Sequence, residues 1–161
     1  MEDIHPLAET YSFKTRVRVC GILVQNNKVL LARHKAAFGE GSFWVPPGGG
    51  LDYGEKVYDC LKREFQEETG LEVEVGRFLY IHEFLRPPLH AIELFFEVKL
   101  LQGDLALGTD PELATDGQLL EEVSFLNMRD LFKLRREEIH PVLHDLVNLD
   151  DLFIPRQMFL K

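Results

Sequence analysis

The chain has 161 residues with a formal net charge of −9, and its 45% hydrophobic and 28% charged residues are typical of one globular domain. A domain of this size needs no disulfides, and its two cysteines, Cys20 and Cys60, lack a paired spacing. The negative charge opposes binding to a nucleic-acid polymer, and no apolar run could span a bilayer. The first ten residues do not resemble a signal peptide. We therefore expect a cytoplasmic protein with no nucleic-acid polymer or membrane as partner.

The charges are distributed unevenly along the chain. Residues 10–39 contain no acid, whereas residues 52–74 contain eight acids against three bases. Residues 100–128 contain six acids and no base. Such runs are often solvated faces. A basic segment facing two acidic ones would also suit a site that holds a metal ion and phosphate groups.

The first half of the chain predicts strands followed by a helix. Residues 16–24 and 28–32 alternate in the manner of a hairpin, joined by a turn at 25–27. Residues 39–50, rich in glycine and proline, predict a shaped loop that contains a short apolar insert. Helical periodicity begins near Glu55 and stops at Gly70, a typical helix terminator.

The second half predicts two long strands, at 71–85 and 89–101, that are separated by a break at Pro87 and Pro88. A polar loop follows over 103–118. The remaining predicted elements are a strand at 122–126, a helix from Asn127 to Arg136 and a helix from Pro141 to Leu149. This order predicts a mixed α/β domain with helices packed against a sheet.

The helix over 55–69 carries the clearest chemical signal. A helical wheel places Val57, Leu61 and Phe65 on its core-facing side. Glu68 and Glu64 fall within or beside the same arc, where an unpaired carboxylate would cost several kcal/mol. Something must therefore neutralise these side chains.

A hard divalent cation is the natural partner of these glutamates. Glu64, Glu67 and Glu68 stand at positions i, i+3 and i+4, so their oxygens can converge on Mg²⁺ or Mn²⁺. Arg63 projects to the other side of the wheel and is not expected to neutralise them alone. The alternative is a solvated acidic face, which the wheel disfavours.

Zinc is a weaker prediction, because the chain contains neither a CxxC nor an HExxH motif. His140 and His144 are four residues apart, but no third ligand stands near them in the sequence. We interpret both as ordinary helix histidines.

The segment from Gly49 to Leu71 follows the pattern G-x5-E-x7-R-E-U-x-E-E-x-G-U, where U is a bulky apolar residue. It resembles the Nudix box of the Nudix hydrolases at every defined position. Residues 44–49 resemble the loop that leads into this box, and residues 125–131 resemble a strand-to-helix segment late in the domain. The resemblance implies an α/β/α sandwich with a mixed sheet between helices. We expect an N-terminal extension (1–13), the domain itself (14–136), and a C-terminal helix and tail (137–161) packed on the domain or on a partner subunit.

By this resemblance, Glu64, Glu67, Glu68 and the backbone carbonyl of Gly48 would bind the metal, Mg²⁺ with Mn²⁺ as a substitute. Arg63 and Glu55 match positions that brace the helix and orient those ligands. The implied reaction is hydrolysis of a nucleoside diphosphate linked to another group, most plausibly a nucleoside diphosphate sugar such as ADP-ribose or a GDP-sugar. The alternatives are hydrolysis of nucleoside triphosphates or dinucleoside polyphosphates, and a non-catalytic nucleotide-binding module.

The general base is not fixed by the motif. A glutamate of the box, often the one equivalent to Glu64, or one from a later loop could accept the proton of the attacking water. The later candidates are Glu112, slightly favoured because it lies in a long loop that could act as a lid, and Glu121 or Glu122.

The residues that would bind the substrate are predicted mainly by charge. Basic side chains suited to phosphate oxygens are Arg16, Arg18, Arg33, Lys35 and Arg86, the last with His90 nearby. Trp44, with Phe43 beside it, could stack on a base, although a core position is the alternative. The apolar C-terminal tail predicts a homodimer.

Overall fold

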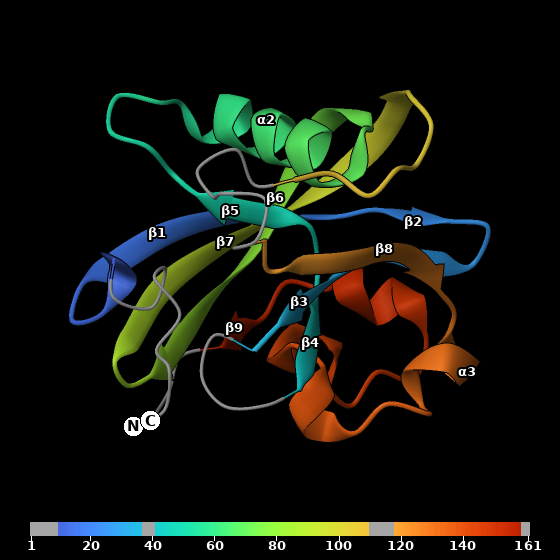
Figure 1. Ribbon diagram of the computed structural model, residues 1–161. Helices are drawn as coiled ribbons and strands as arrows, with labels where there is room; N and C mark the ends of the chain where they lie inside the picture. Colours follow the sequence, from blue (N-terminus) through green and yellow to red (C-terminus); the bar gives the residue numbers. More distant parts are fainter. Residues whose placement is uncertain (1–9, 37–40, 110–117, 159–161) are drawn as a thin grey trace.

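The computed structural model describes residues 10–36, 41–109 and 118–158. Two β-sheets lie at the centre of this part of the chain (Figure 1). The first sheet has the order β5-β1-β7-β6-β9, with bounds Gly48–Gly50, Thr15–Ile22, Leu89–Gln102, Glu72–Arg86 and Gln157–Met158. The second sheet contains β2 (Val24–Gln25), β3 (Lys28–Lys35), β4 (Ser42–Val45) and β8 (Leu120–Leu126).

The first sheet is mixed, as expected. Strand β1 runs parallel to β7 and antiparallel to β5, while β6 and β7 form a long antiparallel hairpin. The hairpin turns at Pro87 and Pro88, so that Arg86 pairs with Leu89, and the predicted break is confirmed. The second sheet, in which all pairings are antiparallel, was not foreseen as a separate layer.

Helix α2 (Val57–Thr69) covers one side of the first sheet. It ends where the sequence predicted, because Gly70 adopts the left-handed conformation (φ 71°) that terminates helices. Its buried residues Leu61 and Phe65 pack in a cluster with Val19 and Phe96 of the sheet. The helix is therefore fixed by its apolar side, and its acidic side remains available.

The beginning of the predicted polar loop closes the end of α2. The amide of Ala106 donates a hydrogen bond to the backbone carbonyl of Thr69 (3.0 Å), and the amide of Gly108 donates one to the backbone carbonyl of Glu68 (3.0 Å). The last carbonyls of a helix lack partners within it, so these contacts satisfy groups that would otherwise be orphaned. Residues 106–109 are consequently bound to the helix.

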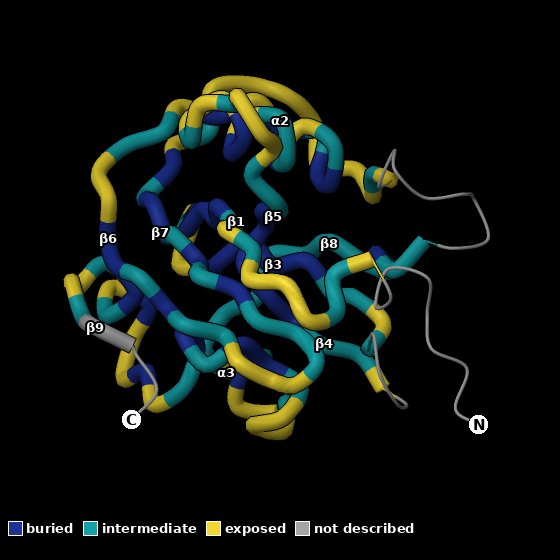
Figure 2. The backbone as a smooth tube through the Cα atoms, turned by 90° about the vertical axis from the view of Figure 1, so that its left-hand side faces the viewer, coloured by how far each residue is buried: buried dark blue, intermediate teal, exposed yellow. Residues whose placement is uncertain are grey.

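A second core lies on the other side of the molecule, beneath the C-terminal segment. Tyr80 and Phe95 of the first sheet pack there with Val142 and Leu152, all of which are buried (Figure 2). The segment contains α3 (Met128–Leu131) and the 3-10 turns η2 (Arg136–Glu138), η3 (Pro141–Leu143) and η4 (Leu149–Phe153). No helix in the described residues is long and apolar enough to cross a membrane.

Both predicted C-terminal helices are wrong in length. The capping box of Asn127 and Asp130 starts α3 as expected, but the helix ends at Leu131. His140 donates its backbone amide to the carbonyl of Trp44 (2.9 Å), which draws the chain into an extended path beside β4. Farther on, Asp145 has a φ of 58°, which ends the turn that begins at Pro141. Tertiary contacts thus override the helical pattern.

The predicted loop over 39–50 contains two strands, β4 and β5. The glycines of β5 and the two prolines before it argue against strand structure locally, but β5 pairs with β1, which is far away in the sequence. Gly48 has a φ of 152°, and a side chain there would collide with the backbone of Val19. The strand therefore depends on its lack of side chains.

We predict that the C-terminal segment contributes to the stability of the whole domain. Leu152→Ala removes a fully buried side chain and should lower the free energy of unfolding by about 2–5 kcal/mol in a urea titration. Leu101→Ala, the same substitution at a position on β7 that is 62% exposed, is the matched control and should change it by less than about 0.5 kcal/mol. Equal effects of the two substitutions would contradict this packing.

Candidate active site

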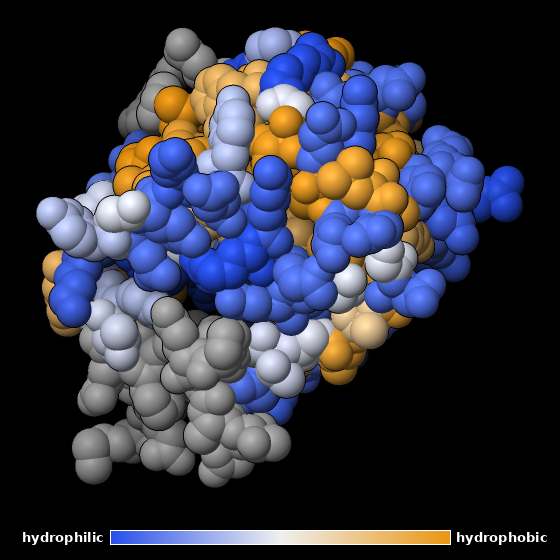
Figure 3. Space-filling model, turned by 90° about the horizontal axis from the view of Figure 1, so that it is seen from above, coloured by the Kyte–Doolittle hydropathy of each residue, from blue (hydrophilic) through white to orange (hydrophobic). Residues whose placement is uncertain are grey.

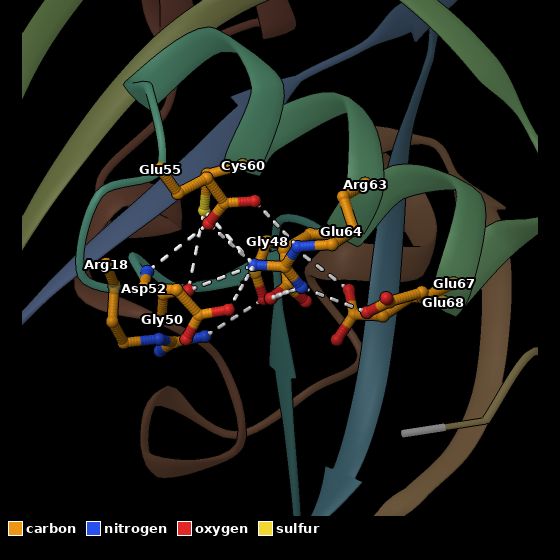
Figure 4. Close-up of polar contacts among 10 residues, drawn as sticks. All are labelled: Arg18, Gly48, Gly50, Asp52, Glu55, Cys60, Arg63, Glu64, Glu67 and Glu68. Atoms are coloured by element: carbon orange, nitrogen blue, oxygen red, sulfur yellow. Dashed lines mark hydrogen bonds and ion pairs between the residues drawn. The ribbon is translucent and has the colours of Figure 1, made fainter. Parts of the chain in front are cut away.

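The acidic side of α2 faces β5 (Figure 4). The amide of Gly48 donates a hydrogen bond to Oε2 of Glu68 (3.0 Å), which ties the strand to the helix. A Cβ at Gly49 would meet the carboxylate of Glu64. The glycines of β5 thus allow the helix carboxylates to approach the backbone of the strand.

Arg63 lies at the centre of the acidic cluster. Its Nη1 donates to Oε1 of Glu64 (2.8 Å) and to Oε2 of Glu67 (3.1 Å), while its Nε donates to Oε1 of Glu55 (2.8 Å). Asp52 lies 3.7 Å from its Nη2. The expectation that Arg63 points away was wrong, because the wheel gives the direction of the Cβ and ignores the reach of a long side chain.

The pKa shifts show how far one arginine can balance these acids. Hydrogen bonding from Arg63 lowers the pKa of Glu55 to about 2, so this carboxylate is charged at neutral pH. Burial raises the pKa of Glu64, although Arg63 opposes that effect, and the neighbouring Glu67 raises it further. Negative charge thus remains in excess around the helix.

The cluster fits a hard divalent cation. Its possible metal ligands are carboxylate oxygens of Glu64, Glu67 and Glu68, beside the backbone carbonyl of Gly48, and oxygen ligands are those that Mg²⁺ prefers. A cation there would also favour the charged form of Glu64, whose pKa is raised by burial and by the neighbouring Glu67.

Two cavities meet beside this cluster. The acidic cleft has a volume of about 900 Å³ and contains the glutamates of α2 together with Arg63 and β5. The side pocket, of about 350 Å³, lies between β1, β7 and β4 and contains Phe43 and Phe84. Arg16, Arg18 and His34 line both cavities, so they mark the boundary. In Figure 3, hydrophilic residues gather in the middle of the face above α2.

Several predicted substrate residues lie at these cavities. Arg16 stacks its guanidinium on the ring of Tyr11 (3.7 Å), and burial together with the nearby Arg18 lowers its pKa to about 10. Lys35 and Arg86 line the side pocket.

Arg33 and Trp44 do not line either cavity. Arg33 lies 3.4 Å from Glu121 and 3.2 Å from Glu122, so it pairs with two of the proposed bases. Glu121 also accepts a hydrogen bond from Ser42 (2.7 Å). Trp44 is 7% exposed and belongs to the second core, which agrees with the alternative that the sequence left open. Glu112 lies outside the described residues.

A buried cluster that sequence reasoning missed lies at the side pocket. Oε2 of Glu93 accepts hydrogen bonds from Nδ1 of His82 (2.8 Å) and Nε2 of His140 (2.7 Å), and Oε1 accepts one from Nη1 of Arg18 (2.9 Å). Glu93 is only 1% exposed. An acid within the apolar run 91–96 was the available signal, but its partners come from distant elements.

His140 therefore has ligand-type neighbours after all, and its interpretation as an ordinary helix histidine was wrong. The nearest ligand atoms of His82, Glu93 and His140 lie within 4.8 Å of one another, close enough to hold a metal ion. However, the amide of Val142 donates to Nδ1 of His140 (3.2 Å), so the ring proton must sit on Nε2. A protonated nitrogen cannot bind a metal, which favours a hydrogen-bond network.

The profile of the NUDIX domain matches residues 14–146, and the chain therefore belongs to this family. It is 32% identical over 120 residues to an ADP-ribose pyrophosphatase of Methanocaldococcus jannaschii, covering 73% of this chain and 65% of the relative. It is 34% identical over 102 residues to an oxidized purine nucleoside triphosphate hydrolase of Mus musculus, covering 61% and 60%.

The solved structures support the fold. A NUDIX hydrolase from Nitrosomonas europaea superposes with a TM-score of 0.64 at 19% identity, covering 81% of this chain and 84% of that chain. A MutT NUDIX hydrolase from Burkholderia pseudomallei gives 0.62 at 21%, covering 86% and 96%. The α/β fold expected from the sequence is thus confirmed. The chain spans 65% of the archaeal relative and 31% of an m7GpppN-mRNA hydrolase of Danio rerio.

We predict that a methyl group at position 49 disturbs the site without unfolding the protein. Gly49→Ala should displace the carboxylate of Glu64 and weaken Mn²⁺ binding, measured by calorimetry, by about tenfold or more. Gly50→Ala is the control, since its Cβ would only approach the end of Arg16 (3.2 Å). The metal assignment of Glu64 would be contradicted if both variants bound Mn²⁺ like the unmodified protein.

Proposed function

We propose that the protein catalyses Mg²⁺-dependent hydrolysis of a nucleoside diphosphate linked to a sugar, with release of a nucleoside monophosphate. The observation that carries the proposal is the set of three helix carboxylates, Glu64, Glu67 and Glu68, facing β5 in a cleft that continues into a second pocket. The cleft would accept the diphosphate, and the pocket would accept one of the attached groups.

The chain's own residues would prepare this site for reaction. Arg63 orients Glu64 and Glu67, and Glu55 holds Arg63 in place. Mg²⁺, when bound, would offset phosphate charge and favour ionisation of the attacking water. Arg16 and Arg18 stand at the boundary of the two cavities, where they can bind phosphate oxygens.

The proton of the attacking water would pass to a carboxylate. Glu121 and Glu122 would have to leave Arg33 before they could accept it. We therefore propose Glu64 or Glu112 as the base. Glu64 lies within the cleft, where it too is held by an arginine, Arg63 (2.8 Å), and Glu112 follows residues 106–109, which are bound to the end of α2.

Two alternatives remain for the reaction. The ADP-ribose pyrophosphatase relative supports a nucleoside diphosphate sugar. Relatives named for their action on CTP, in Escherichia coli, and on oxidized purine nucleoside triphosphates, in Mus musculus, favour a triphosphate. A nucleotide-binding module without catalysis is disfavoured, because every carboxylate of the motif is retained.

The first test is a substrate panel. Purified protein with Mg²⁺ should release a nucleoside monophosphate from ADP-ribose or another nucleoside diphosphate sugar, detected by chromatography, because the metal and cationic side chains stabilise the charge of the leaving phosphate. Preferential cleavage of nucleoside triphosphates would select the alternative substrate class. Binding without cleavage of any compound would instead support the binding module.

The second test removes single metal ligands. Glu67→Gln and Glu68→Gln should each lower kcat by about 10²-fold or more, because the amide cannot replace a charged oxygen ligand. Glu97→Gln is the matched control, since Glu97 pairs with Arg77 (2.9 Å) on the first sheet and lines neither cavity. Full activity of either ligand variant, or of the protein in excess chelator, would contradict the metal assignment.

We also propose that the protein is cytoplasmic and forms a homodimer. The two cysteines are free and buried, which suits a reducing compartment. Exposed apolar side chains of the C-terminal segment, Val147 (83%) and Ile154 (56%), support a contact with a second subunit.

A further inference from the structure

The carboxylate of Glu93 is held by donors from three separate elements. Arg18 comes from β1, His82 from β6, and His140 from the segment before η3, while Glu93 itself lies on β7. His82 and His140 are 5% and 2% exposed, so water does not compete for these contacts. A buried charged network of this kind is costly to assemble unless all its groups are satisfied.

The proton positions in this network are determined by the backbone. Because the amide of Val142 donates to Nδ1 of His140, Nε2 of that ring carries the proton and donates to Glu93. Burial lowers the pKa of His140, which favours the neutral ring that the hydrogen bond from Val142 to Nδ1 requires. Burial also raises the pKa of Glu93, but His140, His82 and Arg18 together hold it below its usual value. An ionised carboxylate thus faces donors only.

Arg18 links this network to the acidic cleft. Its Nη1 donates to Glu93 (2.9 Å). Its Nη2 donates to the carbonyl of Gly48 (3.3 Å), the proposed metal ligand, and Figure 4 shows this second contact. Its side chain is 22% exposed and lines both cavities. Glu93 therefore fixes a guanidinium at the place where a substrate would pass from one cavity to the other.

The same arrangement occurs at the other end of β5. Nη2 of Arg63 donates to the carbonyl of Gly50 (3.3 Å). Arg63 is held by the carboxylate of Glu55, a residue of the Nudix box that is not one of the proposed metal ligands. Each end of the glycine strand is thus contacted by an arginine, and each arginine is fixed by a carboxylate.

We propose that Glu93 is a positioning residue: through Arg18 it fixes the Gly48 end of β5 and presents the guanidinium to the diphosphate of the substrate, with His82 and His140 holding the carboxylate. This inference rests on the proposed function, since it names residues that act on the substrate of the same site. By this proposal, Glu93, His82 and His140, which lie at the side pocket, determine the position of Arg18 in the cleft.

The first measurement is the effect of Glu93→Gln on KM and kcat. The amide places an NH₂ group against at least one N–H donor and, in either orientation, removes the negative charge that pairs with Arg18, so the guanidinium is held less firmly. KM for the best substrate of the panel should rise about tenfold while kcat changes less, because a phosphate contact present before and during the reaction is lost. Glu97→Gln, the same substitution on the same strand, should leave both constants unchanged.

A double-substitution cycle tests whether Glu93 acts through Arg18. Arg18→Met should raise KM in the same direction, and Glu93→Gln should add less than about twofold in the Arg18→Met background. Effects that multiply would show that Glu93 acts independently of Arg18 and would overturn the proposal.

A second pair of variants covers the case in which Glu93→Gln fails to fold. His82 lines neither cavity, so it can influence the substrate only through the residues that it contacts, namely Glu93 and the ring of His140 (centroids 4.7 Å apart). Asn and Leu both remove the ring contact, so a difference between the two variants reports on the hydrogen bond to Glu93. His82→Asn keeps an N–H near the place of Nδ1 and should preserve KM, whereas His82→Leu removes the donor and should raise KM severalfold.

The outcomes separate this inference from the function on which it rests. An unmodified protein that neither binds nor cleaves any compound of the panel overturns both. An active protein whose KM is the same in His82→Asn and His82→Leu, with folding confirmed by circular dichroism, overturns the positioning role alone. A lower thermal midpoint with unchanged KM would also assign the network to stability only.

Discussion

The approach of helix carboxylates to a strand without side chains is the constraint on which the site depends. Glu64 and Glu68 can lie against β5 only because this strand consists of glycines. Gly48 has a positive φ, and a side chain there would collide with the backbone of Val19 on β1. The resulting concentration of negative charge is balanced incompletely by Arg63, so the fold itself creates the demand for a cation. The acidic balance of the sequence, which opposes a nucleic-acid polymer, is therefore compatible with a small nucleotide bound through metal ions.

The elements that the sequence predicts well are those whose causes are local. The apolar stripe of α2 and the terminator Gly70 lie within one segment, and the same holds for the hairpin that turns at Pro87 and Pro88. By contrast, β5 is a strand only because β1 pairs with it, and no residue of 48–50 favours that structure. Periodicity also failed in the C-terminal segment, where the bond between His140 and Trp44 decides the path of the chain.

The part of the candidate site that could be predicted from the sequence is the part whose residues lie on one face of a helix. The three glutamates of α2 belong to this class, and their common environment follows from their positions. The wheel could not foresee that Arg63 turns back over its neighbours, since side-chain reach is absent from that projection. Glu93 and His82 were missed for another reason: their partners lie on four different segments, and only the assembled sheet brings them together.

The two arginines show how such a site can be both charged and rigid. A strand of three glycines has no side chains with which to fix itself, and backbone pairing with β1 holds only one of its edges. Arg18 and Arg63 contact the carbonyls of Gly48 and Gly50, so they hold the two ends of this strand. An arginine has enough donors to contact a carbonyl and a carboxylate at once, which a lysine could not do with the same fixed geometry. The carboxylates of Glu55 and Glu93 therefore stabilise the position of the strand through these arginines, and with it the geometry that the glutamates of α2 require.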